Sequence, residues 1–186
     1  MLRRPPRSTL LPYTPLFRSG NLVKRLTNIP GDDEAPLWSP TGEDLAFISH
    51  QDGNAEVYLL PMDSGKAIRI TAKDPDDMLG DWSPDGVWLA FSRRGSSEER
   101  GLWLRNPDGV NLVHLTEEND SDPRWSPDGK HIVFVRVTDG NSDLYLASRL
   151  KDGTWQDDVQ LTRLTQHEED DRSEEHTSEL QSRAYL

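Results

Sequence analysis

Acidic side chains recur at one fixed position along this chain. Asp33, Asp77 and Asp120 each lie five residues before a tryptophan, and a further acidic loop carries Asp170. If these loops emerge on the same side of a repeating fold, their carboxylates form an acidic rim suited to a cation, a basic peptide or another cationic partner. Alternatively, each aspartate caps its own loop by accepting backbone N–H bonds. The sequence leaves both interpretations open.

The tryptophans after these aspartates begin a repeated Trp-Ser-Pro-x-Gly signature. Its three copies are 44 and 43 residues apart, and a fixed period in this range indicates a β-propeller or a solenoid. Proline and glycine suit the second and last positions of a type I turn. A phenylalanine follows nine residues after each tryptophan, and we expect both aromatic side chains to pack between units. The signature residues are Trp38, Pro40, Gly42, Phe47, Trp82, Pro84, Gly86, Phe91, Trp125, Pro127, Gly129 and Phe134.

Short apolar runs separated by turn residues divide each unit into four strands, the last of which ends in a hydrophobe-Thr pair. No segment has the apolar spacing of a stable helix. We therefore predict an all-β fold, a partial β-propeller of three four-stranded antiparallel blades at about residues 28–71, 72–116 and 117–165. A further closing pair, Leu26-Thr27, predicts one strand that precedes the first blade.

The two ends of the chain differ from the repeats. Residues 1–19 and 172–186 resemble conceptual translations of common sequencing adapters, so we expect both to be artefactual tails outside the fold. The propeller fragment then covers residues 20–171. Because propellers need about four to eight blades to close, we interpret the three blades as an interior piece of a larger propeller. Its remaining blades would be the nearest partners of this piece.

The repeated unit resembles the WD40-like PD40 repeat of TolB-like propellers, which also occurs in the tricorn protease and in prolyl oligopeptidase-type peptidases. The resemblance rests on the Trp-Ser-Pro-Asp-Gly and Phe positions and on Arg-Leu-Thr closures at 25–27 and 163–165. The first unit departs from it by Thr41 in place of aspartate, and the middle unit by Gly80 in place of proline. The resemblance implies a non-catalytic scaffold for protein–protein interaction in the periplasm or another extracytoplasmic compartment.

Composition and motifs narrow the function classes. A net charge of −12 argues against nucleic acid as a partner, and no apolar run is long enough to insert into a membrane. A Gly-x-Ser-x-Gly elbow, a histidine pair at metal-ligand spacing and a phosphate-binding loop are all absent from the sequence. We therefore predict no catalytic residues, metal or cofactor, and a protein or peptide as the partner.

Two other functions fit the same repeats. One is the substrate-gating propeller of a prolyl oligopeptidase-type serine peptidase, with a catalytic domain that lies elsewhere in a longer protein. The other is the sensory propeller of a larger signalling protein. Because unrelated activities share this fold, the repeats alone do not decide among the three.

Overall fold

The computed structural model describes residues 24–72, 75–150 and 154–166 of the chain. Within these ranges all regular structure is β-strand, and the strands form three four-stranded antiparallel sheets. This confirms the predicted fold class. The two ends that resemble adapter translations, and Asp170, lie outside the described residues.

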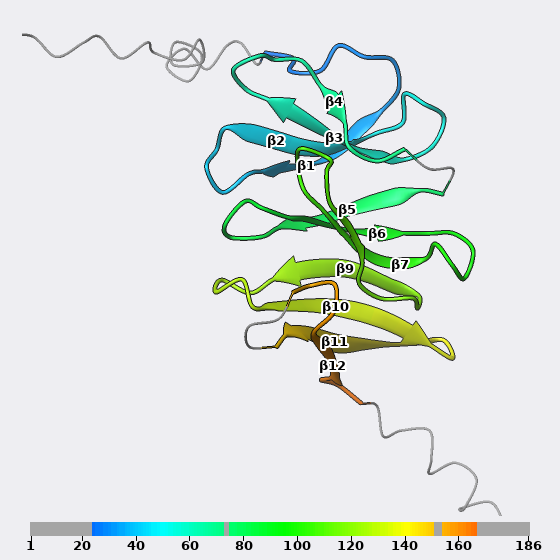
Figure 1. The fold of residues 1–186 in the computed structure, drawn as a ribbon. Coiled ribbons are helices and arrows are strands. Elements are labelled where there is room, and N and C mark those ends of the chain that lie inside the picture. Colours follow the sequence, from blue (N-terminus) through cyan, green and yellow to red (C-terminus); the bar gives the residue numbers. More distant parts are fainter. Residues whose placement is uncertain (1–23, 73–74, 151–153, 167–186) are drawn as a thin grey trace, which may run out of the picture.

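Each sheet is a meander in which the strands pair in chain order. The first sheet contains β1 (Asp33–Trp38), β2 (Asp44–Ser49), β3 (Glu56–Pro61) and β4 (Ile68–Arg69). The second contains β5 (Asp77–Trp82), β6 (Leu89–Arg93), β7 (Gly101–Arg105) and β8 (Leu112–His114). The third contains β9 (Asp120–Trp125), β10 (His131–Thr138), β11 (Asn141–Arg149) and β12 (Val159–Arg163). Figure 1 shows the three sheets following one another in chain order, with the second between the first and the third.

The Trp-Ser-Pro-x-Gly signature forms the turn between the first two strands of each sheet, as predicted. In the second sheet the Gly86 N–H donates to the Ser83 carbonyl at 2.8 Å, and Gly86 has a φ of 73°. The Ser83 hydroxyl accepts the Trp88 N–H at 2.8 Å and donates to Asp85 at 2.6 Å. Asp85 also accepts the Val87 N–H at 3.0 Å. Serine and aspartate thus satisfy backbone groups that the turn leaves unpaired.

The signature tryptophans pack between sheets in two of their three copies. Trp82 is 5% exposed and belongs to a core cluster with Ile48 and Val57 of the first sheet. Trp125 is 9% exposed and packs in the same way against the second sheet. Trp38 is 53% exposed, because among the described residues no sheet precedes β1. The prediction that the tryptophans pack between blades is therefore wrong for Trp38.

The signature phenylalanines are buried in all three sheets. Phe91 shares the core cluster of Trp82, and Phe134 shares that of Trp125. Phe47 lies on the face of the first sheet that points away from the second sheet. There Ile29, from the segment before β1, packs against the cluster that contains Phe47. The expected packing between units is thus present for the second and third phenylalanines, whereas the chain's own N-terminal segment packs on the first.

The described residues contain no strand before β1, so the strand predicted at Leu26-Thr27 is not formed. A closing strand bonds to the third strand of its own sheet, and β3, β7 and β11 already pair with β4, β8 and β12. The segment at 25–27 does keep one hydrogen bond that is also found in the closing strand of the first sheet. The Arg25 Nε donates to the Thr27 carbonyl at 2.7 Å, as Arg69 does to Thr71.

Gly80 departs from the repeat because the second and third sheets approach each other closely there. A Cβ atom at Gly80 would lie 2.8 Å from Cδ and 2.9 Å from the carbonyl oxygen of Pro123. The backbone N–H of Trp125 donates to the Asp81 carboxylate at 2.9 Å across the same contact. A side chain at position 80 would therefore push the two sheets apart.

Candidate functional site

Ionisable side chains contact one another at the same end of each sheet. In an antiparallel meander the start of strand one, the end of strand two, the start of strand three and the end of strand four all meet there. We call this end the loop rim, since it also carries the β2–β3, β6–β7 and β10–β11 loops. The register places Asp33 opposite Ser49, Asp77 opposite Arg93 and Asp120 opposite Arg136.

Asp77 and Arg93 form a buried, two-pronged ion pair in the second sheet. The Nε–Oδ1 and Nη2–Oδ2 distances are both 2.7 Å, and the side chains are 0% and 3% exposed. In the third sheet Arg136 pairs with Asp120 at 2.7 and 2.8 Å. Burial raises the pKa of Asp77, although the ion pair and a hydrogen bond from Thr71 act in the opposite direction. Contrary to prediction, Asp77 and Asp120 do not line an exposed rim, and arginines rather than loop N–H groups satisfy them.

Both arginines also lie over aromatic rings. The Cζ atom of Arg93 is 5.5 Å from the ring centroid of Phe91 and 5.1 Å from that of Trp103. The third sheet repeats the arrangement, with Arg136 at 5.6 Å from Phe134 and 4.7 Å from Tyr145. A guanidinium over an aromatic face is attracted by the ring quadrupole. The signature phenylalanines of these two sheets thus support the ion pairs as well as the core.

The first sheet lacks this arginine. Ser49 stands opposite Asp33 in the same register, where the other two sheets have arginine. Oδ1 of Asp33 and Oγ of Ser49 are both buried without a hydrogen-bond partner. Asp33 therefore differs from Asp77 and Asp120 in keeping unused acceptor capacity.

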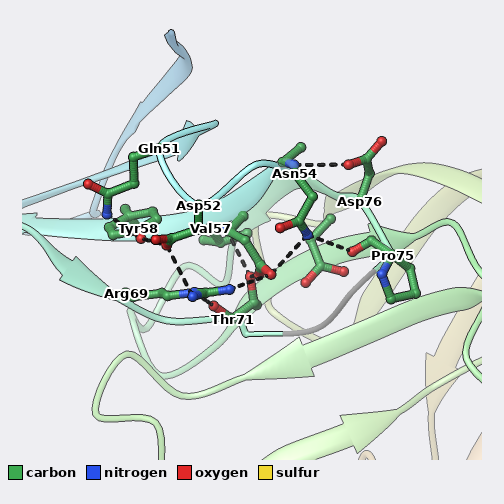
Figure 2. A network of polar contacts seen from close by, with 12 residues as sticks. Gln51, Asp52, Asn54, Val57, Tyr58, Arg69, Thr71, Pro75 and Asp76 are labelled. Atoms are coloured by element: carbon green, nitrogen blue, oxygen red, sulfur yellow. Dashed lines mark hydrogen bonds and ion pairs between the residues drawn. The ribbon is translucent and has the colours of Figure 1, made fainter. Parts of the chain in front are cut away.

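A second recurring contact joins the closing threonine to strand three, as Figure 2 shows for the first sheet. The buried Glu56 accepts hydrogen bonds from the Arg69 guanidinium at 2.8 Å and from the Thr71 hydroxyl. Thr71 Oγ1 in turn accepts the Val57 N–H at 2.9 Å. Because β4 contains only two residues, these side chains supply much of its attachment to β3.

Gln51 and Asp52 of the β2–β3 loop lie beside this group (Figure 2). Asp52 accepts a hydrogen bond from the Tyr58 hydroxyl and lies 3.1 Å from Arg69 Nη1. The Gln51 amide donates to the Tyr58 oxygen. Burial, followed by the hydrogen bond to Asp52, raises the pKa of Tyr58, so its hydroxyl stays protonated at neutral pH. The Asp52 and Arg69 side chains are 37% and 35% exposed, so a partner can reach this group.

The closing contact recurs in the third sheet and is replaced in the second. Asp143 accepts from the Arg163 guanidinium at 2.7 Å and from the Thr165 hydroxyl at 3.2 Å. The equivalent positions of the second sheet are Gly101 and His114. The His114 ring stacks on Trp103 with 3.9 Å between the centroids. Only the first and third sheets therefore close through a carboxylate and an arginine.

The predicted site residues include neither these arginines nor the carboxylates of strand three. One signal for the ion pairs was an arginine sixteen residues after the recurring aspartate in two of the three units. The signal for the closing contact was an arginine two residues before the threonine, at Arg69 and Arg163. A single acid before an apolar run, such as Glu56, is too common a pattern to assign by spacing.

The exposed carboxylates of the loop rim come from its loops and from strand one of the first and third sheets. Their negative field suits a cationic partner. Within residues 24–72, 75–150 and 154–166, no three His, Asp or Glu side chains are grouped to hold a metal ion. In the same ranges no helix could span a membrane. The exposed carboxylates are Asp32, Glu34, Asp52, Asp76, Glu98, Glu117, Glu118, Asp122 and Asp139.

Comparison with known proteins relates this geometry to one family. The profile of the TolB beta propeller domain, PD40, matches residues 16–169, which is more than half of the chain. The chain belongs to the PD40 family of TolB-type β-propellers. The match confirms the resemblance of the Trp-Ser-Pro-x-Gly unit to the PD40 repeat.

Relatives of this PD40 chain are longer than it is. An uncharacterized protein of Agrobacterium fabrum is 32% identical over 123 residues, which is 62% of this chain and 41% of the relative. The Tol-Pal system protein TolB of Desulfosudis oleivorans is 31% identical over 135 residues, which is 67% of this chain and 27% of the relative. The PD40 chain thus spans less than half the length of these two relatives.

Solved structures agree on the fold. A TolB-type protein from Agrobacterium tumefaciens aligns with a TM-score of 0.60 at 24% identity, covering 75% of this PD40 chain and 52% of that protein. TolB from Acinetobacter baumannii aligns with a TM-score of 0.57 at 23% identity, covering 76% and 35%. At these identities the likeness supports the propeller fold alone.

Proposed function

We propose that this PD40 chain is part of a non-catalytic propeller scaffold that binds a protein partner outside the cytoplasm. The observation that carries the proposal is the TolB propeller match over residues 16–169. A relative named as a protein of the Tol-Pal system supports both the protein partner and the compartment. The site geometry also favours binding of a partner over catalysis. Its buried carboxylates are paired with arginines, and the Tyr58 hydroxyl donates a hydrogen bond to Asp52.

The loop rim is the surface that we assign to the partner. It presents the partly exposed side chains of Asp52 and Arg69. Asp52 is hydrogen-bonded to Tyr58, and Arg69 is paired with Glu56. Exposed carboxylates are present at the loop rim of all three sheets. A partner segment that carries lysine or arginine therefore complements this surface.

Photo-crosslinking tests the assignment. A benzoylphenylalanine at Glu98, which is exposed in the β6–β7 loop of the rim, would be compared with one at Val110, which lies beyond the β7–β8 turn at the opposite end of the sheet. Each purified full chain would be irradiated in an envelope extract and in a cytosolic extract of a bacterium that contains a Tol-Pal system. We expect one discrete protein adduct from position 98 in the envelope extract, identified by mass spectrometry and competed by unlabelled chain.

The Val110 position is the matched control, because it is 75% exposed and equally reachable by a partner that binds without preference. Equal adducts at both positions, or no competition by unlabelled chain, would contradict binding at the loop rim. An adduct found only in the cytosolic extract would contradict the proposed compartment. Arg69→Met in the Glu98-labelled chain should weaken the adduct if the Asp52–Arg69 group contacts the partner.

A second candidate function is the propeller of a peptidase. Tricorn protease homolog 1 of Streptomyces coelicolor is 33% identical over 100 residues, which is 52% of this chain and 9% of that protein. In that case the chain would gate access to a catalytic domain encoded elsewhere in a longer gene. A downstream strand-Gly-x-Ser-x-Gly-helix segment in the surrounding gene would favour the peptidase over the scaffold.

A further inference from the structure

Asp-Gly pairs recur in the turns of this chain, and this dipeptide is prone to one spontaneous backbone rearrangement. The glycine nitrogen attacks the side-chain carbonyl carbon of the aspartate, because glycine has no side chain to hinder the approach. The chain contains six such pairs, of which Asp152-Gly153 lies outside the described residues. The other five are Asp52-Gly53, Asp85-Gly86, Asp108-Gly109, Asp128-Gly129 and Asp139-Gly140.

In the Trp-Ser-Pro-Asp-Gly turns, hydrogen bonds hold both groups that would have to react. Asp85 accepts from the Ser83 hydroxyl at 2.6 Å and from the Val87 N–H at 3.0 Å. The Gly86 N–H donates to the Ser83 carbonyl at 2.8 Å. The Asp128-Gly129 pair repeats these three bonds at 2.6, 3.1 and 2.9 Å. Attack by the glycine nitrogen would have to break them.

Two further pairs are held by other partners. Asp108 accepts the Val110 N–H at 2.9 Å, and the Gly109 N–H donates to the Asn106 carbonyl at 2.9 Å. The carboxylate and the N–H of Asp52-Gly53 are likewise engaged, and their partners are the Tyr58 hydroxyl, Arg69 and the His50 carbonyl. All of these contacts lie within one sheet and its turns, so they do not depend on a neighbouring sheet.

The Asp139-Gly140 pair differs from these four. It forms the two-residue loop between β10 and β11, next to the pairing of Thr138 with Asn141. Its φ values of 51° and 85° fit a type I′ turn, which favours Asp-Gly. Among the described residues, neither the Asp139 carboxylate nor the Gly140 N–H has a hydrogen-bond partner. The reacting groups can therefore rotate toward each other without breaking a hydrogen bond of their own, at a hairpin tip where opening costs least.

We propose that Asp139-Gly140 is a site of spontaneous aspartate isomerisation, and that hydrogen bonds protect the other four described pairs. The Gly140 nitrogen bonds to Cγ of Asp139, and the hydroxyl of the protonated carboxyl leaves with the amide proton as water. The product is a five-membered succinimide ring. Water then opens the ring at either carbonyl, which restores aspartate or leaves isoaspartate. Isoaspartate adds one carbon to the main chain, so the two-residue loop no longer matches the strands on either side of it.

Peptide mapping of the aged full chain tests this site, with the other four described pairs as internal controls. The chain would be kept for several weeks in mildly acidic buffer made with water enriched in heavy oxygen, beside a sample unfolded in guanidinium chloride. Each ring that opens takes up one heavy oxygen atom, and electron-transfer fragmentation locates isoaspartate. In the folded chain we expect about tenfold or more isoaspartate at Asp139 than at any of the four, since these must first break hydrogen bonds. In the unfolded sample all pairs should react at similar rates.

Substitutions test the protection directly. Asparagine forms the same ring with loss of ammonia, so Asp139→Asn should deamidate about tenfold or more faster than Asp128→Asn, whose amide oxygen can still accept from Ser126 and Lys130. Ser126→Ala removes one of these donors and should raise isoaspartate at Asp128. Near-ultraviolet circular dichroism would verify that the variants stay folded. Equal isoaspartate at all five pairs of the folded chain, or none at Asp139 while the unfolded sample reacts, would overturn the proposal.

Discussion

At the residue scale, carboxylate–arginine pairs differ in how far water reaches them. Arg93 and Asp77 are 3% and 0% exposed, whereas Arg100 and Glu118 are 42% and 59% exposed. A charge left alone in a buried site cannot be solvated, whereas one near the surface can. The two arginines should therefore contribute unequally to stability.

We expect Arg93→Met to lower the free energy of unfolding by about 3–5 kcal/mol, because it leaves the Asp77 carboxylate buried without a cation. Arg100→Met should cost about 0–1 kcal/mol, since water reaches both members of its pair with Glu118. Urea denaturation followed by circular dichroism measures both. Asp77→Asn in the Arg93→Met background should recover part of the loss, and equal costs for the two single changes would contradict the role of burial.

Two aspartates at the opposite end of the sheets from the loop rim, Asp44 at the start of β2 and Asp128 in the β9–β10 turn, have pKa values displaced in opposite directions. Burial, followed by repulsion from Glu43 and Asp63, raises the pKa of Asp44 above 3.8. The Ser126 hydroxyl and the Lys130 N–H lower the pKa of Asp128 below 3.8. A raised carboxyl pKa adds stability only at low pH and loses it as the pH rises through the folded-state value, whereas a lowered pKa does the reverse.

Substitution by asparagine should reveal these opposite signs. We expect Asp44→Asn to be more stable than the wild type at pH 7, with the gain disappearing below about pH 3.8. Asp128→Asn should be less stable at pH 7, with the loss disappearing as the pH falls through the lowered folded-state pKa. Urea midpoints from pH 7 to strongly acidic solution measure both, and each variant is the control for the other. Stability changes of the same sign in the two variants would contradict the opposite pKa displacements of Asp44 and Asp128.

At the scale of the elements, the strand-one irregularity fixes how closely neighbouring sheets approach. Each strand one shifts register against its strand two, and in the second sheet the shift falls between Leu79 and Asp81, around Gly80. Pro123 of β9 packs onto Gly80 there. The contact depends on a missing side chain in one strand and a rigid ring in the next.

We expect Gly80→Ala to destabilise the chain by about 1–3 kcal/mol, because the new methyl group overlaps the ring and the carbonyl of Pro123. Pro123→Ala in the same chain should recover part of that loss by removing Cδ, although the carbonyl overlap remains. Thermal melts of the two single variants and the double variant measure the coupling. Strictly additive effects would show that the two residues do not meet.

At the scale of the whole molecule, the three sheets are stacked so that each contacts only its neighbours along the chain (Figure 1). Stability in such an arrangement comes from each sheet and from each sheet-to-sheet interface. The same tryptophan therefore has a different role in an interior sheet and in an end sheet. Trp82 fills an interface between two described sheets, whereas Trp38 is 53% exposed.

We expect Trp82→Ala to lower the free energy of unfolding by about 3–5 kcal/mol, since it leaves a cavity between the first two sheets. Trp38→Ala should cost about 1 kcal/mol or less, because more than half of that side chain is exposed to water. Urea denaturation of the two variants compares these losses. Equal losses would mean that Trp38 has an intramolecular partner.

The sequence by itself determined the local features of this protein. Serine, proline and glycine specify the turn at Ser83–Gly86 through bonds that span three to five residues, so no distant contact is needed. The alternation of apolar residues likewise specifies Phe91 and Phe134 as core. A fixed period then implies that the same meander recurs, which is why the fold class follows from the sequence.

Only the tertiary structure decided how the recurring positions are used. Asp33 and Asp77 occupy the same place in the repeat, and Asp77 is satisfied because the strand register brings Arg93 opposite it. Trp38 and Trp82 share one signature, and burial of Trp82 requires a sheet before it. Leu26-Thr27 has the closing pattern and forms no strand without a third strand to bond. Register and neighbouring sheets join distant residues, and a repeat pattern does not encode which neighbours are present.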